Sequence, residues 1–563
     1  MEKLIECVPN FSEGKDLHLI KQITDEIEKT DGVRLLNVDP GKTTNRTVVT
    51  FVGTPEAVCE AAFQAIRKAA ELIDMRKQHG EHPRMGATDV CPLIPVSNIS
   101  MEETAIWSKK LAERVGKELN IPVYLYENSQ PNPLRKNLSL IRSGEYEGFF
   151  KKITQPQWKP DFGPSVFPAA TGATVIGARG FLVAYNINLN TTSVRRANAI
   201  AFDVRETGRV KREGHPVTGK PITDSKGEPV YIPGTLKSVK AIGWYIEEFG
   251  IAQISMNLTD ISVTPVHAAF EEVSKKAMER GIRVTGSELV GLIPLDALLQ
   301  AGRYFLHMQK RSLGISEKEL IKIAVKSLGL EELGPFKPDE RIIEYLLADK
   351  SSSKLAKLSL KEFSEETASE SSAPGGGSVS AYLGSLGAAL GTMVANLSAH
   401  KPGWDEHWEE FSKWAEKGMV LQTRLLALVD EDCSSFNNIM AAFSLPKSTA
   451  EEKNRRTQEI QRATKTATEV PLQVMELSLK SMELIQAMVE KGNPNSVSDA
   501  GVAALCARSA VMGAYLNVTI NAKGLQDKTL AQQLISKGKA LQEKAGALET
   551  SVLSAVSAKI NGN

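Results

Sequence analysis

The hydrophobic pattern changes near residue 348, and this change constrains the fold more than any other feature of the sequence. Before that point, apolar runs of strand length alternate with segments of helical spacing. From Leu358 onward, almost every segment has helical spacing and strand-like alternation disappears. Alternating strands and helices are typical of layered α+β folds, whereas a long helical stretch is typical of a bundle. The sequence therefore predicts an α+β N-terminal half followed by an all-α helical bundle domain.

The N-terminal half repeats one order of elements. The segment from an apolar strand at 4–8 to a strand at 123–126 has a β-α-β-β-α-β core, and a second such unit extends from a strand at 181–189 to one at 282–284. This repetition predicts two βαββαβ subdomains packed around a cleft. Residues 206–233 interrupt the second unit with Gly, Pro and charged residues, which indicate an exposed insertion.

The helical part begins after a short polar segment. Residues 348–355 read Ala-Asp-Lys-Ser-Ser-Ser-Lys-Leu, which is typical of a linker. Beyond them, Gly384, Ala388, Gly391 and Ala395 form a stripe of small residues that permits close helix approach. The predicted organisation is two α+β subdomains, a linker and a helical domain, at 1–180, 181–347, 348–355 and 356–563.

The charge balance and the spacing of the cysteines argue against several classes of protein. The chain has 563 residues, and its 68 Lys and Arg residues against 67 Asp and Glu leave a formal charge of +1. A general nucleic-acid binder would need a large basic excess. The cysteines contain no CxxC pair, which argues against a disulfide scaffold or a cysteine zinc site and favours a reducing compartment. They are Cys7, Cys59, Cys91, Cys433 and Cys506.

The apolar segments do not suggest export or membrane insertion. The N-terminus lacks a basic region followed by an apolar core, as a secretory signal would have. Uninterrupted apolar runs stay below the ~18–20 residues of a membrane helix. We therefore expect a soluble cytoplasmic protein with small-molecule substrates and without nucleic-acid or membrane partners.

A loop at 78–89 is the first place where polar side chains gather without periodicity. A histidine beside a carboxylate and an arginine is typical of a general acid–base centre with an anion-binding guanidinium, and a solvated loop is the alternative. A metal site at His79 and His82 is the weaker interpretation, because no helix places both rings on one face. The candidate side chains of this loop are His79, Glu81, His82, Arg84 and Asp89.

Three further groups are candidates for binding a ligand. A polar cluster follows the strand at 33–38, two asparagines alternate on the strand at 181–189, and a Gly/Pro loop at 161–172 links the repeats. Alternating amides share one side of a strand, which is either the cleft or solvent. The loop either brings backbone N–H groups close to a ligand or acts as a spacer. The polar residues concerned are Asp39, Asn45, Arg46, Asn186 and Asn188.

One carboxylate interrupts an apolar stripe in the helical part. Leu421, Leu425 and Leu428 follow helical spacing, Phe436 and Ile439 continue the same face, and Asp432 lies between them. A carboxylate in a buried stripe is costly unless it is paired or used in chemistry, and burial raises its pKa. The alternative is a structural Asp that bonds a helix end.

Other polar groups of the helical part are less specific. Neighbouring Asp430 and Glu431 point elsewhere on the helix and are expected to be solvated. The glycines at 375–377 precede the small-residue helix, where they can cradle a carboxylate or phosphate, although no Walker sequence follows. Asn517 and Asn521, four residues apart, can hydrogen-bond across the bundle or to a ligand.

Three motifs are specific and occur in a fixed order. They are Cys7-Val-Pro-Asn-Phe-Ser-Glu-Gly14, then Gly80-Glu-His-Pro-Arg-Met-Gly86 with Asp89-Val-Cys-Pro92, and finally Ala373-Pro-Gly-Gly-Gly-Ser378. Together they closely resemble the formimidoyltransferase-cyclodeaminase family over nearly the whole chain. The resemblance implies a bifunctional enzyme of histidine breakdown. Its N-terminal half would transfer a formimidoyl group from N-formimidoyl-L-glutamate to N5 of tetrahydrofolate, and its helical domain would convert the product into 5,10-methenyltetrahydrofolate and ammonia.

The resemblance also implies roles for particular residues. His82 corresponds to the transferase base, Asp432 corresponds to the deaminase acid–base group, and Arg84 could hold glutamate carboxylates. Tetrahydrofolate, polyglutamylated, would be the co-substrate, and no metal is implied. The implied folate loop is Gly163, Pro164, Ser165, Val166, Phe167, Pro168, Ala169, Ala170, Thr171 and Gly172. Additional candidate substrate contacts are Asp39, Asn45, Arg46, Arg84, Asn186, Asn188, Gly375, Gly376 and Gly377.

Two alternatives stay open at this level. The helical domain is also similar to methenyltetrahydrofolate cyclohydrolases, which would pair with a formyl rather than a formimidoyl donor. A non-catalytic folate-binding protein would leave His82 and Asp432 idle. The family resemblance further implies a homo-oligomer, since the family forms ring-shaped octamers, and the Gly/Ala helix faces are compatible with tight subunit contacts.

Overall fold

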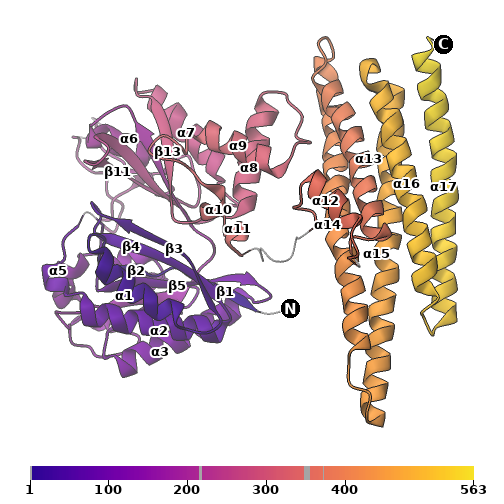
Figure 1. Cartoon of the computed structure of the whole chain (residues 1–563). Coiled ribbons are helices and arrows are strands. Elements are labelled where there is room, and N and C mark those ends of the chain that lie inside the picture. The colour runs from indigo at the N-terminus through magenta and orange to yellow at the C-terminus, as the bar shows by residue number, and fades with distance from the viewer. Residues whose placement is uncertain (1–2, 81, 215–217, 348–354, 372, 563) are drawn as a thin grey trace. The chain divides into compact units, whose positions relative to one another are not determined.

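The computed structural model describes residues 3–80, 82–214, 218–347, 355–371 and 373–562 (Figure 1). The chain divides into two compact units, one formed by Met1–Gly302 with Ala324–Leu347 and the other by Arg303–Ile323 with Ala348–Asn563. Most of the predicted linker, residues 348–354, lies outside the described residues.

The first sheet of the N-terminal unit contains the first predicted repeat. Its strands are β1 (Leu4–Cys7), β2 (Asn10–Phe11), β3 (Val33–Gly41), β4 (Arg46–Gly53), β5 (Thr88–Ser97), β6 (Val123–Glu127) and β7 (Thr174–Ala178). Antiparallel strands lie in the order β3-β4-β1-β5, and β7 and β6 extend the sheet in parallel beyond β5. The short β2 pairs with both β4 and β5.

Helices cover one face of this sheet. They are α1 (Leu17–Glu28), α2 (Pro55–Leu72) and α3 (Met101–Glu118). Ser100 and Glu103 form a capping box that starts α3. The buried apolar side chains of the helices pack on Ile5 and Cys7 of β1. Because side chains alternate along a strand, Glu6 points to the opposite face of the sheet.

The second subdomain repeats this arrangement, which confirms the predicted repeat and the α+β fold. Its main elements are β8 (Val183–Leu189), α6 (Val194–Val204), β11 (Val239–Ile246), β12 (Ile251–Leu258), α7 (Val266–Met278) and β13 (Val284–Val290). The strand order β11-β12-β8-β13 corresponds element by element to β3-β4-β1-β5. The strand predicted at 282–284 was misplaced, because Gly281 (φ +68°) and the next two residues form the turn before β13.

The insertion at 206–233 is exposed over most of its described residues, as predicted. It contains a small hairpin of β9 (Arg209–Val210) and β10 (Tyr231–Ile232). The remaining helices of this part of the chain are α4 (Leu138–Arg142), α5 (Glu145–Lys152), α8 (Leu295–Met308), α9 (Glu317–Leu328), α10 (Pro338–Arg341) and α11 (Ile343–Leu347).

The segment Arg303–Ile323 packs with the helical unit, although the sequence had placed it in the subdomain 181–347. The hydrogen bonds that attach it are Ser312 N to His400 Nε2 at 3.1 Å, Leu313 N to Ser412 Oγ at 2.9 Å and Asn396 Nδ2 to Gly314 O at 2.8 Å. Helical spacing shows that α8 and α9 each have an apolar side, but it does not show which surface that side meets.

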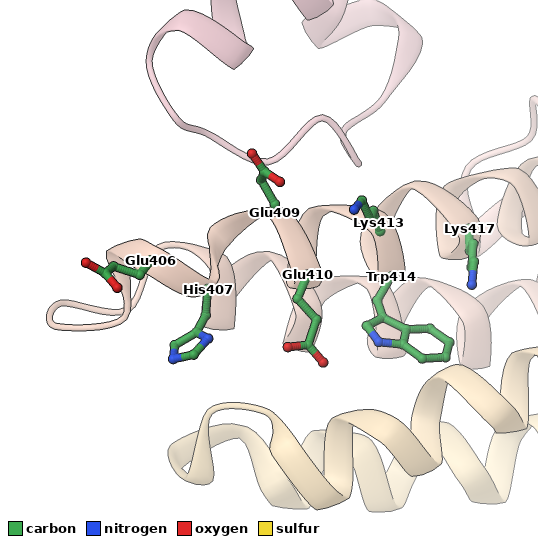
Figure 2. Close-up of a pocket in the computed structure, with 7 residues that line it drawn as sticks. All are labelled: Glu406, His407, Glu409, Glu410, Lys413, Trp414 and Lys417. Atoms are coloured by element: carbon green, nitrogen blue, oxygen red, sulfur yellow. The ribbon is translucent and has the colours of Figure 1, made fainter.

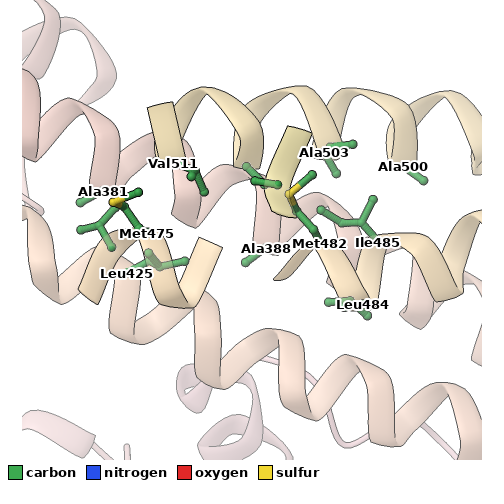
Figure 3. Close-up of a cluster of buried hydrophobic side chains, with 14 of the residues drawn as sticks. Ala381, Ala388, Leu425, Met475, Met482, Leu484, Ile485, Ala500, Ala503 and Val511 are labelled. Carbon is green, nitrogen blue, oxygen red and sulfur yellow. The ribbon is translucent and has the colours of Figure 1, made fainter. Parts of the chain in front are cut away.

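The helical unit is a bundle, as predicted. Its helices are α12 (Leu360–Thr367), α13 (Gly376–Ala399), α14 (Trp408–Phe443), α15 (Ala450–Lys491), α16 (Val497–Ala522) and α17 (Lys528–Ile560). The small-residue stripe of α13 is buried in the core, where Ala388 lies among Met482, Ile485 and Ala503 (Figure 3). A methyl group on Gly384 would overlap Ser478, so close helix approach depends on these small residues.

Candidate active sites

A cleft of about 730 Å³ lies between the sheets of the two α+β subdomains. The helix-free face of the first sheet lines it through Glu6, Arg46 and Pro92, and the second sheet lines it through Ala184 and Asn257. Among the described residues, five cations outnumber three carboxylates in this lining. They are Arg46, Lys136, Arg142, Arg179 and Lys240 against Glu6, Glu127 and Asp260. The cleft therefore favours an anionic ligand.

His82 lies in this cleft, with its Nε2 atom 2.6 Å from Nη1 of Arg46. An arginine side chain only donates hydrogen bonds, so Nε2 accepts and the neutral imidazole carries its proton on Nδ1. Burial, and then the charges of Arg46 and Arg142, hold the pKa of His82 well below its ordinary value. At neutral pH the ring is therefore an unprotonated base.

Asn45 anchors the loop that carries His82. Its Oδ1 accepts from Gly14 N at 3.1 Å, and its Nδ2 donates to Gln78 Oε1 at 2.6 Å and to His79 O at 3.0 Å. Asn45 has a φ of 46°, a left-handed conformation that asparagine tolerates better than most residues. A methyl group on Gly14 would overlap the backbone of Arg46, so the first motif leaves room for the strand that holds Arg46.

Glu6 is a cleft residue that the sequence analysis missed. It is 4% exposed, and burial raises its pKa to about 7 despite the opposing charge of Arg179. The available signal was a carboxylate inside the apolar run Leu4–Val8, the same kind of signal that singled out Asp432. Glu6 therefore changes charge near neutral pH within the cleft.

This pKa makes the stability of the N-terminal unit depend on Glu6 and on pH. The unfolded chain loses the proton near the ordinary value of 4.5 and the folded chain keeps it to about 7, so stability falls as the pH rises between these values. Glu6→Gln stays neutral in both states. It should nearly match the wild type at pH 5 and be more stable by up to about 3 kcal/mol at pH 8. Calorimetry of the full chain at both pH values checks this, and an equal effect at the two pH values would contradict it.

Two predicted substrate contacts have structural partners instead. Arg84 donates to Glu147 Oε1 at 2.6 Å and to Gln78 O at 2.7 Å. Asp39 accepts from Gly291 N at 2.9 Å, which ties β3 to the second subdomain. Within the described part of the chain, neither side chain lines the cleft, and a role of Arg84 in holding glutamate carboxylates stays a prediction.

Asn186 and Asn188 share a face of β8 with the cleft-lining Ala184, but among the described residues neither asparagine itself lines the cleft. Both are buried, and their Nδ2 atoms donate to Glu288 at 3.0 Å and to Glu332 at 2.6 Å, respectively. Gln253 donates to Asn188 Oδ1 at 2.8 Å and completes a buried polar network. Glu288 on β13 and Glu332 thus occupy the amide groups on this part of the cleft-side face, and a contact of either asparagine with substrate stays a prediction.

The Gly/Pro loop at 163–172 contacts the histidine motif but does not line the cleft within the described residues. Its Ala170 and Thr171 carbonyls accept from Met75 N and Ala87 N, both at 2.8 Å. Phe167 packs against Tyr146, with ring centroids 5.3 Å apart. The loop thus joins the segment that follows His82, and its proposed contact with folate stays a prediction.

Asp432 lies on α14 beside the glycine-rich start of α13. Ser378 Oγ is 3.0 Å from Asp432 Oδ2, and it is also 3.0 Å from the carbonyl oxygen of Val429. Burial raises the pKa of Asp432, and the hydrogen bonds from Ser378 oppose this rise. A half-buried carboxylic acid with a raised pKa is suited to acid–base chemistry.

The apolar stripe around Asp432 is shorter than predicted. Leu425 and Leu428 are fully buried, but Phe436 is 40% exposed, so Asp432 marks the end of the buried stripe rather than its middle. Of the neighbouring carboxylates, Glu431 is solvated as expected, with a side chain that is 43% exposed, whereas Asp430 caps backbone N–H groups instead. Asp430 accepts from Leu355 N at 2.8 Å, and Glu431 pairs with Arg424.

The glycines explain how α13 approaches Asp432. A methyl group on Gly377 would overlap the Asp432 carboxylate, and one on Gly376 would touch Asn517 at 3.5 Å. Asn517 Nδ2 donates to Gly513 O at 2.9 Å, which directs its Oδ1 away from that carbonyl. Asn521 instead bonds Ala467 O at 2.7 Å, across the bundle. The third motif therefore brings the start of α13 against Asp432, with Asn517 nearby.

Gly377→Ala should displace the Asp432 carboxylate and lower activity at this site by tenfold or more, whereas activity in the N-terminal cleft should persist. Gly384→Ala is the matched control, because its methyl group crowds Ser478 and Leu425 on the same helix without touching Asp432. If both variants lost the same fraction of activity, general packing damage rather than carboxylate displacement would be responsible.

Another hollow of about 450 Å³ lies at the start of α14 (Figure 2). It is lined by Glu406, His407, Glu409, Glu410, Lys413, Trp414 and Lys417. These alternating charges include Glu410, which pairs with Lys491 at 2.9 Å. The predicted site residues lie elsewhere, and the described residues contain no group of three or more His, Cys, Asp or Glu side chains arranged to hold a metal ion.

Comparison with known proteins covers both units. Three family models match: "Formiminotransferase domain, N-terminal subdomain" over residues 4–179, "Formiminotransferase domain" over 184–348 and "Formiminotransferase-cyclodeaminase" over 359–540. The chain is 42% identical to the formimidoyltransferase-cyclodeaminase of Rattus norvegicus, over 99% of this chain and 100% of that protein.

Two relatives correspond to single units. A glutamate formimidoyltransferase of Streptococcus pyogenes is 39% identical over 55% of this chain and 95% of its own length. A methenyltetrahydrofolate cyclohydrolase of Methylorubrum extorquens is 39% identical over 36% of this chain and 97% of its own length. With full-length relatives and all three family models in agreement, this chain belongs to the formimidoyltransferase-cyclodeaminase family.

Proposed function

We propose that His82 and Asp432 carry two consecutive folate reactions, one in each unit. The chain is a bifunctional enzyme that transfers a formimidoyl group from N-formimidoyl-L-glutamate to tetrahydrofolate and then releases ammonia from the product. The observation that carries the assignment is the His82–Arg46 contact, because it places an unprotonated imidazole in a cationic cleft.

In the transferase step, N5 of tetrahydrofolate attacks the amidine carbon of N-formimidoyl-L-glutamate. His82 Nε2 accepts the proton that N5 loses and returns it to the glutamate nitrogen as the carbon–nitrogen bond breaks. The products are L-glutamate and 5-formimidoyltetrahydrofolate. The low pKa of His82 suits this role, since the ring is unprotonated at neutral pH when the reaction begins.

In the cyclodeaminase step, N10 attacks the formimidoyl carbon and ammonia departs. The formimidoyl group reacts as its protonated amidinium; Asp432 accepts the proton from N10 and delivers it to the leaving nitrogen, which departs as ammonia and leaves the 5,10-methenyltetrahydrofolate cation. Ser378 holds the carboxylate in place, and the raised pKa of Asp432 favours transfer in both directions. Asn517 Oδ1, an acceptor, suits the N–H groups of the formimidoyl nitrogen.

A single assay tests the proposal. The enzyme is supplied with N-formimidoyl-L-glutamate and tetrahydrofolate, and free ammonia is followed together with the absorbance of 5,10-methenyltetrahydrofolate. Equal amounts of both products are expected. Folate binding without either product would favour a non-catalytic folate-binding protein.

A cyclohydrolase is the second candidate for the helical unit, favoured by its 39% identity to the M. extorquens enzyme. That activity would hydrolyse 5,10-methenyltetrahydrofolate and pair with a formyl donor. Replacing N-formimidoyl-L-glutamate by N-formyl-L-glutamate separates the two: formyl transfer without ammonia release supports the alternative.

We also propose that the enzyme is a homo-oligomer that buries an apolar face of α13 and α16. These adjacent helices, with Pro494–Ser496 before α16, are long and apolar enough to cross a membrane, and 61% and 44% of their most apolar windows are buried in the bundle. Large apolar side chains remain exposed on both helices. They are Leu386, Met393, Leu397, Val502, Leu505, Met512, Leu516 and Ile520. In a two-fold symmetric dimer, the same face of a second copy packs on this surface and buries these side chains.

Val502→Lys with Leu505→Lys should weaken this contact, because two buried charges without partners would enter the interface. Light scattering of the purified chain should then report a smaller mass than for the wild type. Val420→Lys, at a 70% exposed apolar position on α14, is the control and should keep the wild-type mass. A monomeric wild-type chain would exclude the proposal directly.

Finally, we propose that the folate carries a polyglutamate tail and that the enzyme acts in the cytoplasm. Lys136, Arg179 and Lys240 in the cleft lining supply positive charge for an anionic tail. The scattered cysteines fit a reducing compartment.

A further inference from the structure

The base assigned to the transferase step is blocked in the unliganded enzyme. His82 Nε2 must accept a proton from N5, yet in the structure it already accepts a hydrogen bond from Arg46 Nη1 at 2.6 Å. Because the guanidinium has no acceptor and stays protonated, this contact occupies the lone pair that the reaction needs.

Arg46 itself is poorly compensated where it lies. Its Nε atom is buried and has no hydrogen-bond partner among the described residues. Burial, together with the charge of Arg142, lowers the pKa of Arg46 to about 10. A guanidinium in this state would gain much from a carboxylate placed in the cleft.

The nearby carboxylates are committed to other groups. Asp89 accepts from Met85 N at 3.0 Å and pairs with Arg142. Asp39 accepts from Gly291 N and is 3.8 Å from Arg341. Both act on Arg46 only as more distant charges. Within the described residues, no carboxylate of the chain forms an ion pair with Arg46 at 4.0 Å or less.

We propose that Arg46 caps His82 in the unliganded enzyme and leaves it for a carboxylate of N-formimidoyl-L-glutamate, so that substrate binding frees Nε2 for N5 of tetrahydrofolate. This inference rests on the proposed role of His82 as the transferase base. Arg46 is then a substrate-binding residue that also controls when the base becomes available.

Replacing the Arg46–His82 contact by an ion pair between Arg46 and the substrate carboxylate favours both side chains. A guanidinium forms two parallel charge-assisted hydrogen bonds with a carboxylate, whereas it forms one bond with the neutral imidazole. Neutralising Arg46 also removes the nearest cation from His82. Among the described residues, the other charged group that acts on the ring is Arg142, which is already paired with Asp89. The pKa of His82 therefore rises in the complex, which makes the ring a stronger base at the moment of transfer.

The contact can be measured without turnover. Diethyl pyrocarbonate acylates an accessible unprotonated imidazole nitrogen, and peptide mass spectrometry of the full chain reports the rate at His82 alone. The wild type should react slowly, and saturating L-glutamate should increase the rate about fivefold or more, whereas a ligand that only covers the ring would decrease it. Arg46→Gln should react fast without L-glutamate and gain nothing from it.

The pH dependence gives a second readout. A base must be unprotonated, so activity falls as the pH drops through its pKa. In the wild type, the acid limb of kcat/KM, which reports the free enzyme, should lie at lower pH than the acid limb of kcat. In Arg46→Gln the acid limbs of kcat/KM and kcat should lie at the same pH, because no cation leaves His82 when substrate binds. The KM for N-formimidoyl-L-glutamate should rise tenfold or more.

Two results would contradict the proposal that Arg46 caps His82. They are distinct from the result that would contradict the role of His82 as the base. Wild-type His82 that reacts as fast as the Arg46→Gln variant, or that L-glutamate protects, would exclude it even if His82 is the base. Conversely, His82→Ala with normal transferase activity would remove the proposed base, while the acylation rates would still report whether glutamate displaces Arg46.

Discussion

Asp432→Asn should stop ammonia release while formimidoyl transfer continues. The amide keeps the size of the side chain and can still accept from Ser378 Oγ, so the bundle should fold, but it cannot shuttle a proton. Loss of an acid–base group typically costs ~10²–10⁴-fold in rate. The measurable result is accumulation of 5-formimidoyltetrahydrofolate with stoichiometric release of L-glutamate.

Asp430→Asn provides the matched control for this experiment. Asp430 lies two residues earlier on α14, and its carboxylate accepts from the backbone of Leu355 and Ala356. That variant should keep its deaminase activity and lose at most some stability where the chain enters the bundle. If Asp432→Asn produced ammonia at nearly the normal rate, Asp432 would be a structural carboxylate.

His82→Ala should have the opposite effect. Formimidoyl transfer should fall by ~10²–10⁴-fold because no group remains at the position of Nε2 to accept the proton from N5. Ammonia release from supplied 5-formimidoyltetrahydrofolate should persist, since Asp432 belongs to the other compact unit. The measurement is the initial rate of each reaction, assayed separately on the same preparation.

His79→Ala tests whether the effect is specific to His82. His79 is exposed in the same loop, and its contribution to the structure is the backbone carbonyl that accepts from Asn45, which alanine retains. Transferase activity should therefore survive in His79→Ala. Equal loss of both activities in a folded His82→Ala variant would contradict the assignment of His82 to the transfer step.

Elements with a clear hydrophobic period were predictable from the sequence alone. The strand expected at 181–189 contains β8 (Val183–Leu189), and the apolar runs at 4–8 and 123–126 became β1 and β6. Such patterns are local, because a period of two in a strand or 3.6 in a helix marks which side chains will be buried together. The carboxylate at 432 was found in the same way, as an interruption of that period.

The sequence pattern did not predict which distant segment packs on each buried or polar face. Asn186 and Asn188 share one face of β8 as predicted, but Glu332, far away in the sequence, covers that face. The segment 303–323 has helical spacing that is equally suited to either unit, and only the folded chain assigns it to the bundle. Periodicity identifies a face and carries no information about its partner.

The α+β and helical halves, the repeated subdomain and the candidate carboxylate Asp432 were thus predictable from residue patterns, and the family resemblance singled out His82 within the polar loop at 78–89. The tertiary structure decided the chemistry of their surroundings: Arg46 meets His82 across 36 positions of sequence, and Ser378 meets Asp432 across 54. Desolvation and Coulomb energies depend on which distant segments come within a few ångströms of each other. For that reason the low pKa of His82, the raised pKa of Asp432 and the contact between Arg46 and His82 emerge only when the chain is folded.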